Sequence, residues 1–481
     1  MSTNESSSYR ASSLGLDLHL ELPARPGGRT LASALRDAVR KGRLPAGSRV
    51  PSTRALAADL GISRGTVTRA HELLAAEGYL VVRQGSPTTV ATGPFDEPKP
   101  TGIPATRRGT ELRWDLLPGK PDLSMFPRQD WTAAQHRALR AVPAGELDYG
   151  NPCGHPALRT ALTEYLGRVR GVHTTPEQVV VCEGHHRALA VLSAVLRQRG
   201  TRSVDYEDPA LPKLRGIPRA EGLEVRAVPV DAEGIDVTGI ESPAVVVTPA
   251  HQYPLGSTMS ARRRKALCEA AASEQRLVVE DDYDGEFRFD REPVGALQRL
   301  APRNVVYAGT TSKALAPGLR LSWLVLPPGL VGPVWEVKAH ADRNPPVFDQ
   351  LTLAEMLRSG SYDQHVRRCR AVYRRRRKQL VSAIRESDTR HELYPAGIAA
   401  GLHLTLRLDP DGPSEERMLK RMRRHSVALE GLAEHWIDER RRQDGLVIGY
   451  AAPPGHSFGN SLRALLRGLS EPRGRGSTRQ P

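Results

Sequence analysis

At 481 residues the chain is longer than a single hydrophobic core usually supports, so we expect at least two domains. It has no apolar run long enough to cross a membrane, no leader-like N-terminus and no CxxC pair among four cysteines, so we expect a cytoplasmic protein with reduced thiols. The net charge of +15, with 12 Lys and Arg against 7 Asp and Glu in residues 1–90, favours an acidic partner.

The first 27 residues are polar and are interrupted by Gly and Pro, so we expect a flexible N-terminus. Order is expected to begin at Gly28, where apolar residues at helical spacing predict a first helix. Ser52 is placed to cap a helix over 53–60, and Ser63 a second helix ending near Glu77. Two short strands, 78–83 and 88–90, then flank a hairpin that contains Gly85. This order predicts a winged helix-turn-helix domain over residues 28–91.

The second helix of this domain has polar side chains on one face and apolar ones on the other. Polar and basic residues there, and in the turn before, suit phosphates and base edges of the major groove. The stretch from Pro45 to Val67, with EGYL at 77–80, resembles the GntR-type winged helix. The resemblance implies a double-stranded DNA operator as partner, and the candidate contacts are Ser52, Arg54, Ser63, Arg64, Thr66, Thr68, Arg69 and Gly85.

Residues 92–112 are rich in Pro and Gly and read as a linker, whereas a second domain is expected over 113–470 and a disordered tail over 471–481. Within the second domain, apolar strands alternate with helical patterns, among them strands at 203–206, 224–228 and 244–247 and a helix at 261–274. The alternation predicts a parallel α/β sheet, followed by a small C-terminal α/β subdomain. The basic run at 367–378 reads as the solvated face of a helix.

One lysine stands out within the sheet region. An apolar run ends in the motif GTTSK (309–313), and Arg320 follows a Pro-Gly turn. A lysine can form a Schiff base, while the hydroxyls of Thr310 and Ser312 and the guanidinium can hold a phosphate. This combination suits pyridoxal 5'-phosphate bound to Lys313. The alternative is a surface lysine in an ordinary turn.

A second motif supports the cofactor. The strand that ends in EDDYDGEF (280–287) offers carboxylates of the kind that hold a pyridine nitrogen protonated, followed by Tyr283. Gly184 and His185 begin a helix after an apolar strand, where free amides bind phosphate. Adjacent histidines there lack a third ligand, so no metal site is expected. Together the two motifs resemble fold-type I aminotransferases.

The fusion of both domains, with PAHQYP at 249–254, resembles the MocR-type subfamily of GntR regulators. The resemblance implies that Lys313 carries the cofactor, that Asp281 faces its ring nitrogen and that Tyr283 faces its ring oxygen; the residues alone leave Asp281 and Asp282 open. It also implies a homodimer, in which Tyr149 reaches the neighbouring subunit's phosphate. The implied cofactor residues are Lys313, Asp281, Tyr283, Arg320, Thr310, Ser312, Gly184, His185, Tyr149 and Tyr253.

Two departures from aminotransferases bear on activity. Leu211 stands where the pattern has a tyrosine over the cofactor, and no arginine lies near 446–448 to bind a substrate carboxylate. We therefore expect a regulator that senses pyridoxal phosphate or an amino compound, with weak or no transamination. The alternatives are an active aminotransferase carrying a DNA-binding module and a regulator with a vestigial pocket.

Overall fold

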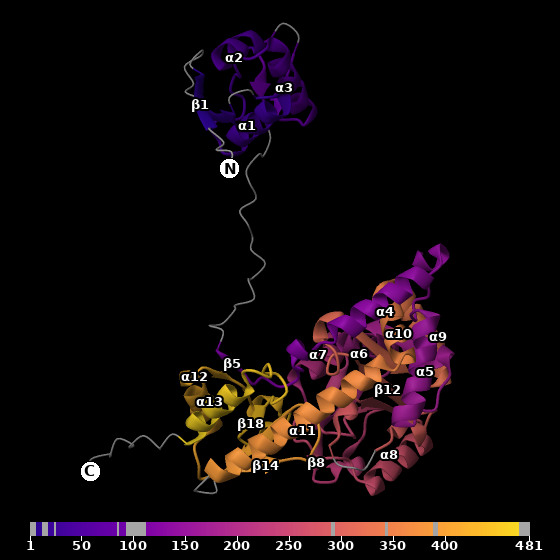
Figure 1. Cartoon of the computed structure of the whole chain (residues 1–481). Helices are drawn as coiled ribbons and strands as arrows, with labels where there is room; N and C mark the ends of the chain where they lie inside the picture. Colours follow the sequence, from indigo (N-terminus) through magenta and orange to yellow (C-terminus); the bar gives the residue numbers. More distant parts are fainter. Residues whose placement is uncertain are drawn as a thin grey trace, which may run out of the picture. The chain divides into compact units, whose positions relative to one another are not determined.

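The computed structural model describes residues 6–11, 18–23, 26–83, 86–92, 112–289, 294–341, 345–387 and 393–470. The chain divides into two compact units, Met1–Arg108 and Gly109–Pro481 (Figure 1). No helix in these described ranges is long and apolar enough to cross a membrane. The predicted linker (92–112) and tail (471–481) lie almost wholly outside the described residues, as does Gly85.

The first unit is built on three helices, α1 (Gly28–Arg40), α2 (Thr53–Leu60) and α3 (Arg64–Ala76). The hydroxyl of Ser52 caps α2 by accepting from the Ala55 amide, and that of Ser63 caps α3 by accepting from the Thr66 amide. Strands β3 (Leu80–Val81) and β4 (Thr89–Val90) pair antiparallel as the wing. A common apolar core joins the helices and the wing.

The N-terminal segment differs from the sequence prediction. Strands β1 (Ser6–Ala11) and β2 (Leu18–Pro23) pair antiparallel, and Leu20 and Leu22 are buried in the same core as α1. The cause is visible in the sequence as LDLHLEL at 16–22, where apolar and polar residues alternate with the period of a strand. Burial of two leucines from one face therefore adds a hairpin to the winged domain.

The second unit contains an eight-stranded sheet in the order β6-β13-β12-β11-β10-β7-β8-β9. Its strands are β6 (Val179–Glu183), β7 (Ser203–Asp208), β8 (Glu224–Asp231), β9 (Gly234–Ile235), β10 (Ala244–Val247), β11 (Leu277–Asp281), β12 (Val305–Thr310) and β13 (Leu321–Val325). The prediction of a parallel sheet is wrong for β13 and β9, which run antiparallel to their neighbours. The connections that precede them are too short for a helical crossover.

Helices cover both faces of this sheet. Successive residues of β12 enter different cores: Tyr307 joins a core shared with α5 and α11, and Val306 joins one shared with α6 and α9. The helices are α4 (Arg128–Ala141), α5 (Pro156–Arg170), α6 (His185–Gln198), α7 (Pro212–Ala220), α8 (Ala261–Ser273), α9 (Pro328–Ala341), α10 (Val347–Arg358) and α11 (Ser361–Ser387).

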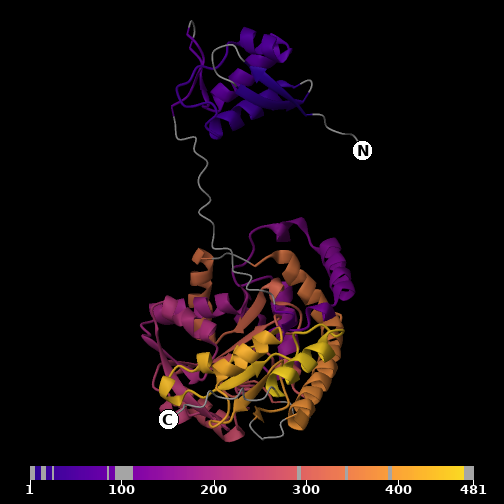
Figure 2. The same ribbon diagram turned by 90° about the vertical axis from the view of Figure 1, so that its left-hand side faces the viewer.

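A smaller C-terminal subdomain follows α11 and faces the viewer in yellow in Figure 2. Its sheet has the order β14-β15-β18-β17, and β5 (Trp114–Asp115) pairs parallel with β16 (Val427–Ala428). The remaining elements are β14 (Leu393–Ala396), β15 (Leu404–Leu408), β17 (Glu430–Gly431), β18 (Gly445–Ile448), α12 (Glu415–Arg424) and α13 (Phe458–Ser470).

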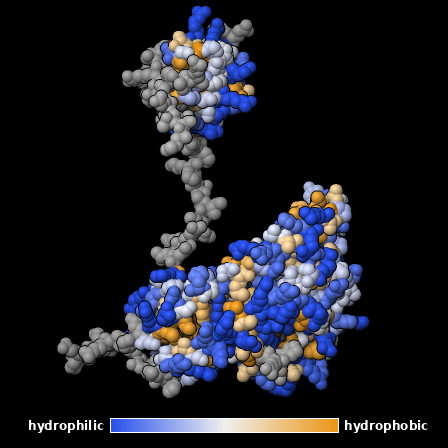
Figure 3. All heavy atoms as spheres, viewed as in Figure 1, coloured by the Kyte–Doolittle hydropathy of each residue, from blue (hydrophilic) through white to orange (hydrophobic). Residues whose placement is uncertain are grey.

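The basic run on α11 is only partly a solvated face. Arg367, Arg374 and Arg375 are exposed, and hydrophilic side chains dominate the face of this unit in Figure 3. Arg376, in contrast, is buried and pairs with buried Asp122 at 2.7 Å. A buried charge needs such a partner, so this pair fastens the segment around Asp122 to α11.

Candidate cofactor site and nucleic-acid interface

The predicted cofactor residues gather at one edge of the large sheet. Gly184 follows β6, Asp281 ends β11 and Lys313 follows β12, and these three strands point the same way. Their carboxyl ends therefore meet at a common edge, where open α/β sheets place their ligands. Each of these strands is apolar in its interior and is followed or ended by polar residues, which are the candidate ligands.

Lys313 is a buried lysine with one close partner. Its Nζ donates a hydrogen bond to the carbonyl oxygen of Gly119 at 2.7 Å. Burial lowers the pKa of Lys313, and the charges of Asp281 and Asp284 oppose that shift. A lowered pKa makes the neutral, nucleophilic amine more abundant, which Schiff-base chemistry requires. Gly119 was not predicted, because a backbone carbonyl leaves no signature in the sequence.

The two neighbouring carboxylates have different surroundings. Asp282 Oδ2 pairs with Arg170 Nε at 2.6 Å and accepts the Tyr307 hydroxyl at 2.7 Å. Asp281 lies 3.1 Å from His185 Nε2, and its Oδ1 finds no hydrogen-bond partner among the described residues. Asp282 Oδ1 also has no partner there, but the other oxygen of Asp282 is held by both Arg170 and Tyr307. Asp282 is thus fastened to the fold by two groups, whereas Asp281 has His185 beside it and an acceptor for a further group.

Gly184, Arg320, Thr310 and Ser312 form a small cradle. Arg320 Nη2 donates to the Glu183 carbonyl at 3.0 Å, and a Cβ added to Gly184 would meet the Arg320 guanidinium at 2.7 Å. The Thr310 hydroxyl donates to Ser312 Oγ at 2.9 Å. Since Gly184 precedes the first turn of α6, free backbone amides point toward the same place.

The electrostatics of this cradle suit an anion. The pKa of His186 in the first turn of α6 is lowered, chiefly by burial and then by the positive charges of His185, Arg320, Lys213 and Lys313. Several positive groups therefore converge at one helix N-terminus, where a phosphate dianion would be stabilised.

An aromatic group lies beside the acids. Tyr283 donates its hydroxyl to the His251 carbonyl at 3.0 Å, and His251 Nδ1 lies 2.9 Å from Asp284 Oδ2. Tyr253 stands edge-on to Tyr283, with ring centroids 5.9 Å apart. The hydroxyl of Tyr283 is thus engaged within the protein, although it was predicted to face the cofactor ring. His251 is a neighbour that the sequence analysis quoted without giving it a role.

The structure also describes the surroundings of the other residues that the sequence analysis discussed. Tyr149 is 72% exposed in the single chain. Arg440 and Arg441 pair with Asp438 at the surface, so neither compensates for the missing carboxylate arginine. Leu211 occupies the position before the first turn of α7 and is half-buried.

Most of the candidate DNA contacts that the structure describes are exposed on the winged domain. Ser52, Arg54, Ser63, Arg64 and Arg69 are exposed, and Thr66 and Thr68 are half-buried. Arg64 Nε reaches Thr53 Oγ1 of α2 at 3.4 Å, while Thr68 donates to the Arg64 carbonyl at 3.0 Å. Val67, Ala70 and Leu74 of α3 face the core, which leaves the polar face free for a nucleic acid.

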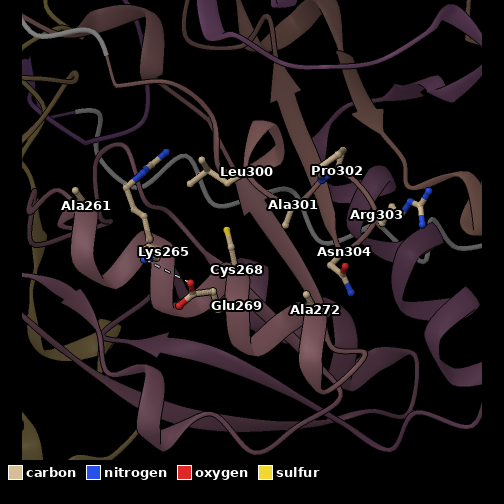
Figure 4. Close-up of a pocket in the computed structure, with 11 residues that line it drawn as sticks. Ala261, Lys265, Cys268, Glu269, Ala272, Leu300, Ala301, Pro302, Arg303 and Asn304 are labelled. Atoms are coloured by element: carbon tan, nitrogen blue, oxygen red, sulfur yellow. Dashed lines mark ion pairs between the residues drawn. The ribbon is translucent and has the colours of Figure 1, made fainter.

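The residues present fit pyridoxal 5'-phosphate. The unsatisfied Asp281 oxygen suits a pyridinium N–H, and the cradle suits a phosphate. The buried amine of Lys313 follows β12, which lies between β6 and β11 in the sheet. A separate hollow lies between α8 and residues 300–304 (Figure 4). It sits near the start of β12, at the opposite edge of the sheet, and Cys268 in it has a pKa raised to about 11, chiefly by burial. The charged side chains Lys265 and Glu269 in that hollow pair with each other at 3.7 Å, and none of the predicted cofactor residues lines it.

Comparison with known proteins identifies the family that each of the two units matches. Residues 28–90 match the gntR family of bacterial regulatory proteins, and residues 122–430 match aminotransferase class I and II. The HTH-type transcriptional regulator YdeL of Bacillus subtilis is 36% identical over 81% of this chain and 85% of its own. The probable rhizopine catabolism regulatory protein MocR of Rhizobium meliloti is 34% identical over 77% and 79%. Kynurenine aminotransferase of Pyrococcus horikoshii shares the fold, with TM-score 0.66 and 24% identity over 74% and 90%.

Proposed function

The chain belongs to the MocR-type regulators, which join a GntR-type DNA-binding domain to an aminotransferase-like domain, and we propose that its second domain senses pyridoxal phosphate or an amino compound. The first unit supplies DNA binding for transcription regulation. Pyridoxal 5'-phosphate is the cofactor of the aminotransferase-like domain. The observation that carries the proposal is the unsatisfied Asp281 carboxylate beside a buried lysine and an anion cradle.

Each residue has a separate task in holding the cofactor. Lys313 supplies the nucleophilic amine, which the Gly119 carbonyl orients. Asp281 would keep a proton on the ring nitrogen, and His185 Nε2 lies 3.1 Å from that carboxylate. Arg320, Thr310, Ser312 and the first amides of α6 would bind the phosphate. When bound, the cofactor supplies a reactive carbonyl and an electron-withdrawing ring.

A sensing role is favoured over turnover by what the site lacks. Residues 445–448 contain no arginine that could hold a substrate carboxylate, and Arg440 and Arg441, a few residues earlier, pair with Asp438. Without that contact, an amino acid loses much of the orientation that transamination requires. Binding alone can still act on DNA, provided the ligand prefers one state of the chain, typically by about 1–3 kcal/mol.

The test combines spectroscopy with DNA binding. Wild-type protein, Lys313→Ala and the surface control Lys265→Ala are loaded with pyridoxal phosphate and titrated with DNA selected from a random pool. We expect a borohydride-sensitive absorbance band in the wild type and the control but not in Lys313→Ala. We also expect DNA affinity to change with cofactor or amine. Unchanged affinity together with steady conversion of an amino donor to its keto product would establish the enzyme alternative instead.

A further inference from the structure

A charged cluster beside the cofactor site is explained by neither the fold nor the proposed cofactor contacts. It consists of Glu430 on β17 and Glu434 and His435 on the short turn that follows. Each offers a ligand atom within 4.8 Å of the others. Glu434 is exposed, Glu430 is partly exposed and His435 is buried.

His435 is the residue that marks this cluster as a binding site. Its Nδ1 lies 3.1 Å from the Gly431 carbonyl, so the ring proton belongs on that nitrogen. Its Nε2 lies 3.7 Å from a Glu430 oxygen and has no hydrogen-bond partner among the described residues. Burial lowers the pKa of His435 to about 4, so Nε2 carries a lone pair rather than a proton. A lone pair that faces two carboxylates calls for a cation between them.

The surrounding residues stabilise this arrangement. Arg215 donates to the backbone carbonyls of Glu434 and His435 at 2.9 and 2.8 Å, which fixes the turn, and its charge also interacts with the Glu434 carboxylate. The charges of Lys213 and, to a smaller extent, Lys120 lower the pKa of Glu430, and Lys120 is also paired with Asp115 at 2.9 Å. The pKa of Glu430 is raised, first by burial and then by the charge of Glu434. A bound cation would offset both the burial of the charge and the repulsion between the two carboxylates.

The cluster adjoins the cofactor residues through one aromatic ring. Glu430 forms a hydrogen bond with Tyr253, whose ring lies 5.5 Å from His435 and edge-on to Tyr283. Glu430 is also the strand partner of Val447 on β18. The segment 446–448 is where aminotransferases carry the arginine that binds the substrate carboxylate. This chain therefore presents acids where its relatives in fold present a base.

We propose that Glu430, Glu434 and His435 bind the far end of an amino effector, and that this end is a second ammonium group rather than a carboxylate. The ligand class is thus a diamine or a longer polyamine. The inference rests on the proposed function, because the other end of the ligand would lie toward Lys313. A subsite for an ammonium group would be the opposite of the carboxylate subsite expected in an aminotransferase fold.

The experiment uses three amines that differ only at the far end: 1,4-diaminobutane, butylamine and 4-aminobutanoate. Full-length protein loaded with pyridoxal phosphate is titrated by calorimetry with each. We expect the diamine to bind about tenfold more tightly than butylamine, and 4-aminobutanoate to bind more weakly than either. Glu434→Gln should remove most of this advantage. Glu416→Gln, the same change at an exposed glutamate paired with Lys420 on α12, should leave it.

Several outcomes would overturn the inference. Equal affinities for the three amines, or a preference for 4-aminobutanoate, would contradict a subsite that binds an ammonium group. A diamine preference that disappears after dialysis against EDTA and returns with Zn²⁺ or Mn²⁺ would assign the cluster to a metal ion instead. The cofactor band is recorded before each titration. If the band is present and the preference is absent, only this inference fails; if the band is absent, the proposed function fails with it.

Discussion

At the scale of single residues, the two neighbouring carboxylates Asp281 and Asp282 have different partners and therefore different expected roles. Asp281 ends β11 and Asp282 follows it, and the two carboxylates contact different groups. Asp282 is held by Arg170 and Tyr307, and breaking such a buried pair leaves an uncompensated charge. Asp281 has no such structural duty.

We therefore predict opposite effects for the two amide substitutions. Asp282→Asn should lower the free energy of unfolding of the second unit by about 3 kcal/mol. Asp281→Asn should leave that free energy nearly unchanged and weaken cofactor binding by at least about tenfold. Urea unfolding and absorbance titration of both variants measure the two quantities. Loss of cofactor in Asp282→Asn with full stability would mean that the roles are reversed.

The sequence could single out Lys313, Arg320 and the Gly184 turn as candidates, since these depend on local motifs. It could not choose between Asp281 and Asp282, because the choice depends on which sheet face Arg170 covers. Arg170 lies more than a hundred residues upstream. Likewise the partner of Lys313 is a backbone carbonyl, and the acidic cluster of Glu430, Glu434 and His435 includes a strand residue that is positioned by the pairing of β17 with β18.

At the scale of elements, the added hairpin β1–β2 is part of the winged domain rather than a loose lead-in. Its local signal was an alternation of leucines, which a polar overall composition hid. The antiparallel β13 was missed for a related reason: strand patterns predict strands but not their direction, which the length of the connection decides.

We predict that Leu22→Ala destabilises the winged domain by about 2–5 kcal/mol, because the side chain is 1% exposed in its core. Val82→Ala, at a position 56% exposed in the same domain, should change stability by less than about 0.5 kcal/mol. Amide hydrogen exchange of α1 and α3 in the full-length protein reports the difference. Equal protection in both variants would show that the hairpin is dispensable.

The recognition face of α3 gives a second prediction at this scale. Arg64→Ala should weaken binding to any duplex and lower the slope of log affinity against log salt by about one, because one phosphate contact is lost. Arg54→Ala should do the same. Arg440→Ala removes an equal charge from the other unit and should leave the slope unchanged. If all three variants behave alike, net charge rather than the helix face governs binding.

At the scale of the whole molecule, the exposed Tyr149 becomes informative. A large aromatic side chain that is 72% exposed in a single chain is a common feature of residues that a partner covers. The cradle of Gly184 and Arg320 is built from one chain, and the resemblance to aminotransferases implies that Tyr149 of a second subunit would complete it. A dimer would also present two winged domains to paired half-sites, as two-fold symmetric operators require.

We accordingly predict that the protein sediments as a homodimer at micromolar concentration and that Tyr149 acts across its interface. Tyr149→Phe should lower cofactor affinity by about threefold to tenfold, because a hydroxyl contact to phosphate is lost, while the dimer persists. Leu147→Ala, a change at a neighbouring exposed residue, serves as the control. Mixing Tyr149→Phe with Lys313→Ala gives the decisive comparison. If Tyr149 reaches the partner's cofactor, each mixed dimer has one site with both substitutions and one site with neither. About half of the sites in the mixed dimers should then have wild-type affinity, whereas none should if Tyr149 acts within its own chain.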